Sequence, residues 1–213
     1  MIFRSNPTLE ELQNSDEFEQ IAVLEHTGVK DFVIEQLSTD SKLIRGFMIY
    51  QIIMVLVGLF IATRPLVLAI SGNSEPLFWL IGALVFSFTL LIIIHELLHL
   101  LAFKLTGAPR VRIGGYLKQF IFYAEADRHV LNRRQFTFVA LVPLIVVKLI
   151  TLAGVVFTFP NPAFYFWLFI MSVHSLFCAG DIGMLAFFGR FPDSEIFTFD
   201  VKETRQSFFY RKK

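Results

Sequence analysis

Charged residues and cysteines are both scarce in this chain of 213 residues. Only 17% of the residues are charged, compared with about a quarter in a typical soluble domain. The single cysteine, Cys178, excludes an intrachain disulfide. The formal net charge of +1 excludes a general electrostatic attraction to nucleic acid, so no nucleic-acid partner is expected.

Apolar residues are correspondingly abundant. Hydrophobic residues make up 55% of the chain, phenylalanine occurs 26 times, and the mean hydropathy is +0.62. The excess of apolar side chains predicts contact with lipid, so we expect an integral membrane protein whose first partner is the bilayer. The first forty residues are polar and acidic, so we expect no cleavable signal peptide.

Four hydrophobic stretches are each near the roughly 20 residues that a helix needs to cross the hydrocarbon layer. They cover residues 46–70, 76–103, 136–159 and 163–188. The predicted fold class is therefore all-α integral membrane, with four transmembrane helices between residues 46 and 190.

The loop charges predict the orientation of these helices. The segment 104–135 contains seven basic residues, and the tail after Phe188 contains six. Both termini and the 104–135 loop are therefore expected in the cytoplasm by the positive-inside rule, in a multi-pass protein of a bacterial plasma membrane. This leaves residues 1–45 as an N-terminal cytoplasmic amphipathic segment and 191–213 as a cytoplasmic tail.

Short polar segments between and around the spans carry weaker patterns. Asn6-Pro7-Thr8 is typical of a helix start, and the apolar residues Phe18, Ile21, Ala22 and Leu24 suggest a short amphipathic helix that ends near Gly28. Val29–Leu37 suggests another helix. Val111–Ala124 suggests a small cytoplasmic β-hairpin that turns at Gly114-Gly115, and Ile196–Val201 alternates like a strand.

The sequence His95-Glu96-Leu97-Leu98-His99 fits the HExxH template. Residues four apart share one helix face, so His95 and His99 can bind one tetrahedral zinc ion. Glu96 can then accept a proton from water whose pKa the metal lowers toward ~7. A carboxylate in mid-membrane costs roughly 2.5–3.5 kcal/mol, which favours a functional role over a structural polar cluster.

A third metal ligand is required, and two carboxylates are candidates. The metzincin continuation is absent, because Ala102 and Leu105 stand where glycine and histidine would be. Asp181 is nine residues from the cytoplasmic end of the fourth span, at roughly the 13 Å depth expected for His95, so it is preferred. Glu125, in the central loop, is the alternative.

These residues resemble a known kind of enzyme. The membrane HExxH, the following hairpin and the late Gly180-Asp181 pair are similar to the site-two protease type of intramembrane metalloprotease. The four-span layout and the His174…Gly180-Asp181-Ile182 segment resemble more closely a bacterial family known as putative zincin peptidases. The resemblance implies zinc-dependent proteolysis. The site-two pattern of Asn and Pro before Leu-Asp-Gly is missing here, and no PDZ-like insertion is present.

Two further polar residues lie within the predicted spans. His174 is seven residues before Asp181, about 10 Å further along a straight helix, which makes it a candidate for substrate binding or for supporting the metal ligands. A buried histidine with only a structural hydrogen bond is the alternative. Lys148 is a candidate for the same roles, or for snorkelling. His26 and His129 fall in polar segments and are expected to be surface histidines.

The functional prediction is zinc-dependent intramembrane or membrane-surface proteolysis of membrane-anchored protein substrates, with Glu96 as general base. A non-catalytic metal-binding carrier or scaffold is the alternative, and a surface-facing peptidase that uses Glu125 is a third possibility. Glu96 discriminates between the first two, because a carrier needs ligands but no carboxylate beside the first histidine. The sequence leaves the oligomeric state open.

Overall fold

The computed structural model describes residues 6–116 and 121–213. The chain is mostly helical and divides into two compact units. We call one the strand unit and the other the helical unit. The strand unit comprises Met1–Ile44, Glu96–Val142 and Gly180–Lys213, and the helical unit comprises Arg45–His95 and Pro143–Ala179.

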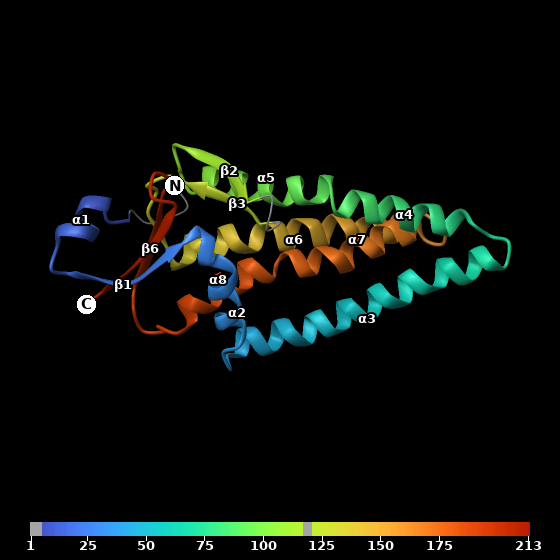
Figure 1. The fold of residues 1–213 in the computed structure, drawn as a ribbon, viewed down its shortest axis with the longest axis horizontal. Helices are drawn as coiled ribbons and strands as arrows, with labels where there is room; N and C mark the ends of the chain where they lie inside the picture. Colours follow the sequence, from blue (N-terminus) through green and yellow to red (C-terminus); the bar gives the residue numbers. More distant parts are fainter. Residues whose placement is uncertain (1–5, 117–120) are drawn as a thin grey trace. The chain divides into compact units, whose positions relative to one another are not determined.

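Six helices contain most of the apolar sequence (Figure 1). They are α3 (Lys42–Ile70), α4 (Glu75–Ser87), α5 (Leu90–Leu105), α6 (Arg133–Thr158), α7 (Phe164–Phe177) and α8 (Ala179–Gly189). By length and composition, α3 and α6 are each able to cross a membrane, and up to four spans result if the bent pairs α4–α5 and α7–α8 each count as one. The helix α3 exposes large apolar side chains such as Leu59 and Phe60, as a lipid-facing helix does.

The predicted second and fourth spans are both broken helices. The pair α4–α5 bends by 46° and the pair α7–α8 by 42°. At the first break, the Thr89 hydroxyl donates to the Val85 carbonyl at 2.7 Å and competes with the helical hydrogen bond. At the second, Cys178 ends α7, and its backbone N–H reaches the His174 carbonyl only at 3.4 Å.

Aromatic contacts and close approach of helices hold the helical unit together. Helix α4 packs on α7, where Trp79 and Phe86 both contact the Phe166 ring. Gly154 of α6 leaves space for Trp167 of α7, because a Cβ there would overlap the indole. Small residues at such crossings are typical of helices that pack inside membranes.

The strand unit contains a four-stranded antiparallel sheet in the order β1-β6-β5-β4. Its strands are β1 (Phe18–Glu25), β6 (Gln206–Lys212), β5 (Ile196–Val201) and β4 (Leu131–Asn132). The predicted strand at Ile196–Val201 is confirmed, but the predicted helix at Phe18–Leu24 is wrong. Residues 18–25 pair with 206–212, and this long-range pairing overrides the local helical spacing. The all-α fold class is therefore too narrow.

Short helices flank this sheet in the strand unit. They are α1 (Leu9–Asn14), the 3-10 turn η1 (His26–Gly28) and α2 (Val29–Leu37). Thr8 and Glu11 form a reciprocal capping box that starts α1. The prediction of a helix at Val29–Leu37 is confirmed, and its Val33 fits against Gly183, where a Cβ would collide.

A separate hairpin pairs β2 (Val111–Tyr116) with β3 (Ile121–Ala126). The hairpin was predicted, but the predicted glycine turn is misplaced. Gly114 and Gly115 lie inside β2, opposite Tyr123 and Phe122, and the connection at 117–120 falls outside the described residues. A Cβ at Gly114 would overlap the Tyr123 ring, so glycine is needed there for cross-strand packing.

Candidate metal site

The HExxH sequence lies in the middle of α5. His95, Glu96 and His99 are all buried, with exposures of 5%, 6% and 7%. Because α5 is helical throughout, His99 follows His95 by one turn on the same helix face. Apart from Lys104 near its end, apolar residues occupy the rest of the helix.

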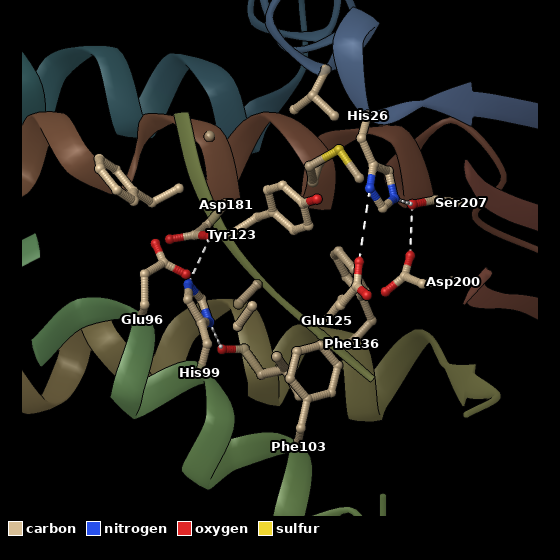
Figure 2. A pocket seen from close by; sticks show the side chains of 17 residues that line it. His26, Glu96, His99, Phe103, Tyr123, Glu125, Phe136, Asp181, Asp200 and Ser207 are labelled. Atoms are coloured by element: carbon tan, nitrogen blue, oxygen red, sulfur yellow. Dashed lines mark hydrogen bonds and ion pairs between the residues drawn. The ribbon is translucent and has the colours of Figure 1, made fainter. Parts of the chain in front are cut away.

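In the strand unit, His99 contacts a carboxylate and a carbonyl at its two ring nitrogens. Its Nε2 is 3.1 Å from Oδ1 of Asp181, which α8 supplies. Its Nδ1 is 3.0 Å from the Val139 carbonyl of α6, which can only accept, so Nδ1 carries the proton. This hydrogen bond orients the ring so that Nε2 is directed at Asp181 (Figure 2).

These groups line a cavity of about 190 Å³ within the strand unit. Figure 2 shows Glu96, His99 and Asp181 on one side of this cavity. Aromatic and apolar side chains form its walls, including Phe103, Tyr123, Phe136, Val139, Ala140 and Met184. The carboxylate of Glu96 and the two potential ligand atoms thus share one partly enclosed space.

A second polar group lines the same cavity and was not foreseen from the sequence. Ser207 donates to Asp200 at 2.6 Å, and its oxygen is 3.3 Å from His26 Nε2. Glu125 is paired with Arg112, and its other oxygen is 3.8 Å from His26 Nδ1. The residues come from η1, β2, β3, β5 and β6, so no short sequence pattern marks the group.

Burial controls the titration of this second group. Burial lowers the pKa of His26, and the histidine is therefore neutral at pH 7. Burial, with the nearby Glu125 charge, raises the pKa of Asp200 to about 6. The prediction that His26 is a surface histidine is wrong, since its exposure is 4%. His129, predicted to be a surface histidine as well, is half-buried and forms a hydrogen bond with Thr106.

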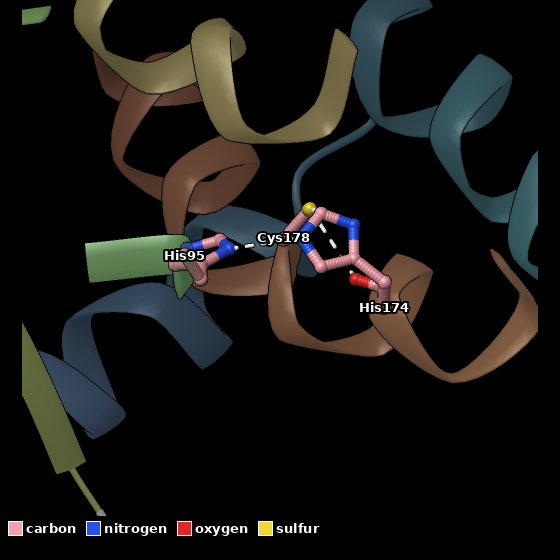
Figure 3. Close-up of side chains that lie close together, drawn as sticks. All are labelled: His95, His174 and Cys178. Atoms are coloured by element: carbon pink, nitrogen blue, oxygen red, sulfur yellow. Dashed lines mark hydrogen bonds between the residues drawn. The ribbon is translucent and has the colours of Figure 1, made fainter. Parts of the chain in front are cut away.

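In the helical unit, His95 contacts His174. The His95 Nδ1 is 3.1 Å from His174 Nε2, and the other nitrogen of His174 is 3.7 Å from the Cys178 sulfur (Figure 3). His174 and Cys178 are fully buried. The contact of His174 with His95 is not indicated by the sequence, because the two residues lie on different helices, 79 positions apart.

Lys148 is held by main-chain and side-chain groups of the helical unit. Its ammonium donates to the Met171 carbonyl of α7 and lies 3.3 Å from the Met54 sulfur of α3. It is also 5.1 Å from the centre of the Tyr50 ring. These contacts join α3, α6 and α7, so Lys148 contributes to the packing of the three helices.

The two candidates for the third ligand are placed differently. Asp181 contacts His99 directly, whereas Glu125 is engaged by Arg112. Within the residues that the structure describes, Glu125 belongs to no group of three potential metal ligands. The donor chemistry therefore suits zinc at the Asp181 side of the cavity: an imidazole of fixed tautomer faces a carboxylate, with the HExxH glutamate nearby.

In metalloproteases of the zincin class, the two histidines of an HExxH sequence on a helix bind zinc and the glutamate is the general base. The family model described as "Putative zincin peptidase" matches residues 88–196, just over half of the chain, and the chain belongs to this family. The match includes α5 with its HExxH as well as His174 and Asp181. Membership implies zinc-dependent peptidase chemistry in general. No curated protein and no solved structure matches the chain.

Proposed function

We propose that this chain is a zinc-dependent peptidase of the membrane that cleaves membrane-anchored protein substrates. The observation that carries the proposal is the contact of His99 Nε2 with Asp181, 3.1 Å long, in the cavity that Glu96 also lines. The family gives the general chemistry, and the two to four helices able to cross a membrane support the location.

The proposed metal ligands are His95, His99 and Asp181. Each histidine is tied at Nδ1, His99 to the Val139 carbonyl and His95 to His174, so each would ligate through Nε2. When bound, zinc would supply a Lewis acid that polarises a peptide carbonyl and makes water acidic near neutral pH. Three protein ligands leave a fourth position open, as catalytic zinc sites require.

Glu96 is the proposed general base. Its position beside His95 on α5 directs it into the cavity without making it part of the ligand face. It would take a proton from the attacking water and pass it to the leaving amine. The apolar walls around it exclude bulk water, which strengthens each charge interaction in the cavity.

The size of the cavity restricts the substrate. The cavity has a volume of about 190 Å³. A folded domain or an intact helix about 10 Å wide does not fit, so a substrate segment must unwind before cleavage. We propose an unwound segment at the cytoplasmic side of a membrane-anchored protein.

His174 and Lys148 have supporting roles in this proposal. His174 would orient His95 through the 3.1 Å contact, which is the usual task of a group behind a metal-bound histidine. Lys148, already bonded to the Met171 carbonyl, would stabilise the polar interior of the helical unit or meet a substrate carbonyl.

The test is a comparison of Glu96→Gln with the wild type. The variant should keep about one zinc per chain, because Glu96 is no ligand, and should lose about 10²–10⁴-fold in the cleavage of co-expressed membrane-anchored reporters. His95→Ala should lose metal and cleavage together. A metal-binding carrier would instead show no cleavage in the wild type, and near-wild-type cleavage by Glu96→Gln would remove Glu96 from the mechanism.

The proposed orientation places both termini and the 104–135 loop in the cytoplasm of a multi-pass plasma-membrane protein. It is tested with a single cysteine at the exposed Arg128, introduced as Arg128→Cys into a Cys178→Ser chain. An impermeant thiol reagent should label this cysteine only after the cells are opened. Labelling on intact cells would overturn the orientation.

A further inference from the structure

Three side chains of metal-ligand type converge inside the helical unit, apart from the cavity. They are His95, His174 and Cys178, and one potential ligand atom of each lies within 4.8 Å of the others. Their exposures are 5%, 0% and 0%. Such a group of two imidazoles and a thiol has the donor set of a site for a soft metal ion.

The end of α7 creates this convergence. His174 and Cys178 are one turn apart, and the Cys178 sulfur also approaches the His174 carbonyl at 3.3 Å. This contact holds the sulfur against α7, 3.7 Å from His174 Nδ1. Figure 3 shows the His174 ring with the sulfur beside it and His95 approaching from α5. The helix break at Cys178 therefore keeps the thiol close to both imidazoles.

The distances are near those of a metal site. Two nitrogens bound at ~2.0–2.1 Å to one tetrahedral ion are about 3.3 Å apart, and a nitrogen and a thiolate sulfur at ~2.3 Å are about 3.6 Å apart. The observed separation of His95 Nδ1 and His174 Nε2 is 3.1 Å. The 3.7 Å contact of the sulfur is with the other nitrogen of His174, so the sulfur must shift toward Nε2 for one ion to bind all three side chains, and the ligand atoms of the three residues already lie within 4.8 Å of one another.

We infer that His95, His174 and Cys178 form a second metal site, which takes a soft, thiophilic cation. The ion would bind one nitrogen of each imidazole and the Cys178 sulfur, and the thiol proton would be released to solvent. The group is buried, Tyr50 and Lys148 interact electrostatically with Cys178, and a thiolate together with imidazoles favours ions such as Cd²⁺ or Cu⁺ over hard cations.

His95 links this site to the proposed zinc site. A neutral imidazole has one acceptor nitrogen, so His95 cannot ligate two ions unless it loses its second proton. A soft cation would therefore compete with zinc for His95 and inhibit the peptidase. This consequence rests on the proposed function, whereas binding of the soft cation does not.

The alternative is a chain of hydrogen bonds with no metal, in which His174 only orients His95. Both interpretations use the same contacts, but they differ in whether the sulfur can bind an ion. Because the protein has one cysteine, any thiolate-to-metal charge-transfer absorption must come from Cys178. The readout is therefore specific for the site.

The experiment is a titration of the full-length, metal-stripped protein in detergent with Cd²⁺. The wild type should develop an ultraviolet thiolate-to-cadmium band that saturates at about one ion per chain. Cys178→Ser and Cys178→Ala should abolish the band, and His174→Gln should weaken binding at least ten-fold. His129→Gln, a histidine outside both sites, is the matched control and should change nothing.

Two results would overturn the inference: no band in folded wild-type protein, or a band of unchanged affinity in His174→Gln. His99→Ala separates the two hypotheses, because it removes a proposed zinc ligand and should leave the cadmium band intact. In zinc-loaded wild type, zinc should leave as the band grows. If both ions stay bound, competition for His95 is refuted, and if zinc never binds, the proposed function fails while the cadmium site stands.

Discussion

Buried polar side chains have different partners in the two units. In the helical unit they bond to main-chain carbonyls of neighbouring helices. Gln51 donates to the Ser175 carbonyl at 3.0 Å, and Ser172 donates to the Met54 carbonyl at 2.5 Å. Carbonyls are present at every residue, so these bonds position helices without selecting a particular chemistry.

In the strand unit, buried polar side chains bond to one another around the cavity. Ser207 donates to Asp200, and Arg112 pairs with Glu125. Each group depends on a particular partner, so a single substitution leaves a charge or an acceptor unsatisfied. The helical unit thus provides the frame and the strand unit most of the reactive groups. Exceptions in the helical unit are the group of His95, His174 and Cys178 and the hydrogen bond from Arg64 to the buried Tyr165.

The largest expected effect concerns the two carboxylates of the cavity. Asp181→Asn should weaken zinc binding by at least 100-fold, because it removes the negative charge that faces His99 at 3.1 Å. Glu125→Gln should keep zinc near the wild-type level, since Glu125 is paired with Arg112. Zinc binding by the two variants is measured as the metal content that remains after dialysis against increasing concentrations of a chelator. Metal loss in Glu125→Gln alone would favour Glu125 as the third ligand.

A smaller effect is expected from pH through Asp200. Its pKa is about 6 in the folded protein against 3.8 as the ordinary value. Between these pH values the folded state holds a proton that the unfolded state has lost, so this group makes stability fall as pH rises from about 4 to about 6. The fall is on the order of 3 kcal/mol for a shift of this size.

Asp200→Asn should remove that part of the pH dependence, measured by denaturant unfolding at several pH values between 4 and 7. The amide oxygen can still accept from Ser207, so the hydrogen bond is preserved. Asp16→Asn, at an exposed aspartate, is the control and should leave the profile unchanged. An Asp200→Asn profile identical to the wild type would show that the carboxyl is not protonated near pH 6.

Local patterns were sufficient to predict some parts of this molecule. The apolar helices and the His95–His99 motif follow from composition and from four-residue spacing. The sheet does not, because Phe18 pairs with Lys212 at the far end of the chain. Over so short a segment, the hydrophobic residues at 21, 22 and 24 fit the period of a helix and that of a strand equally well. Only the pairing with the partner strand decides between helix and strand.

The candidate site, like the fold, was predictable where it depends on local sequence and not where it depends on contacts between distant segments. The motif on α5 could be identified from its own residues, and Asp181 could be favoured from its depth. The burial of His26 could not, because its neighbours Glu125 and Ser207 lie about one hundred and more residues away in the sequence. The contact between His95 and His174 required the packing of α5 with α7 in addition to the sequence spacing.

The smallest expected effects compare one serine from each unit. Ser172→Ala removes a bond to a carbonyl within the helical unit and should cost about 0.6 kcal/mol, the average for such bonds between membrane helices. Ser207→Ala removes the donor to Asp200 and should cost about 1–3 kcal/mol at pH 7, because a charged acceptor is left unsatisfied. Ser71→Ala, at an exposed serine that directly follows α3 and bonds to the Val67 carbonyl, is the control for both. Unfolding in mixed micelles measures the three free energies, and equal costs for Ser172→Ala and Ser207→Ala would refute the contrast between the units.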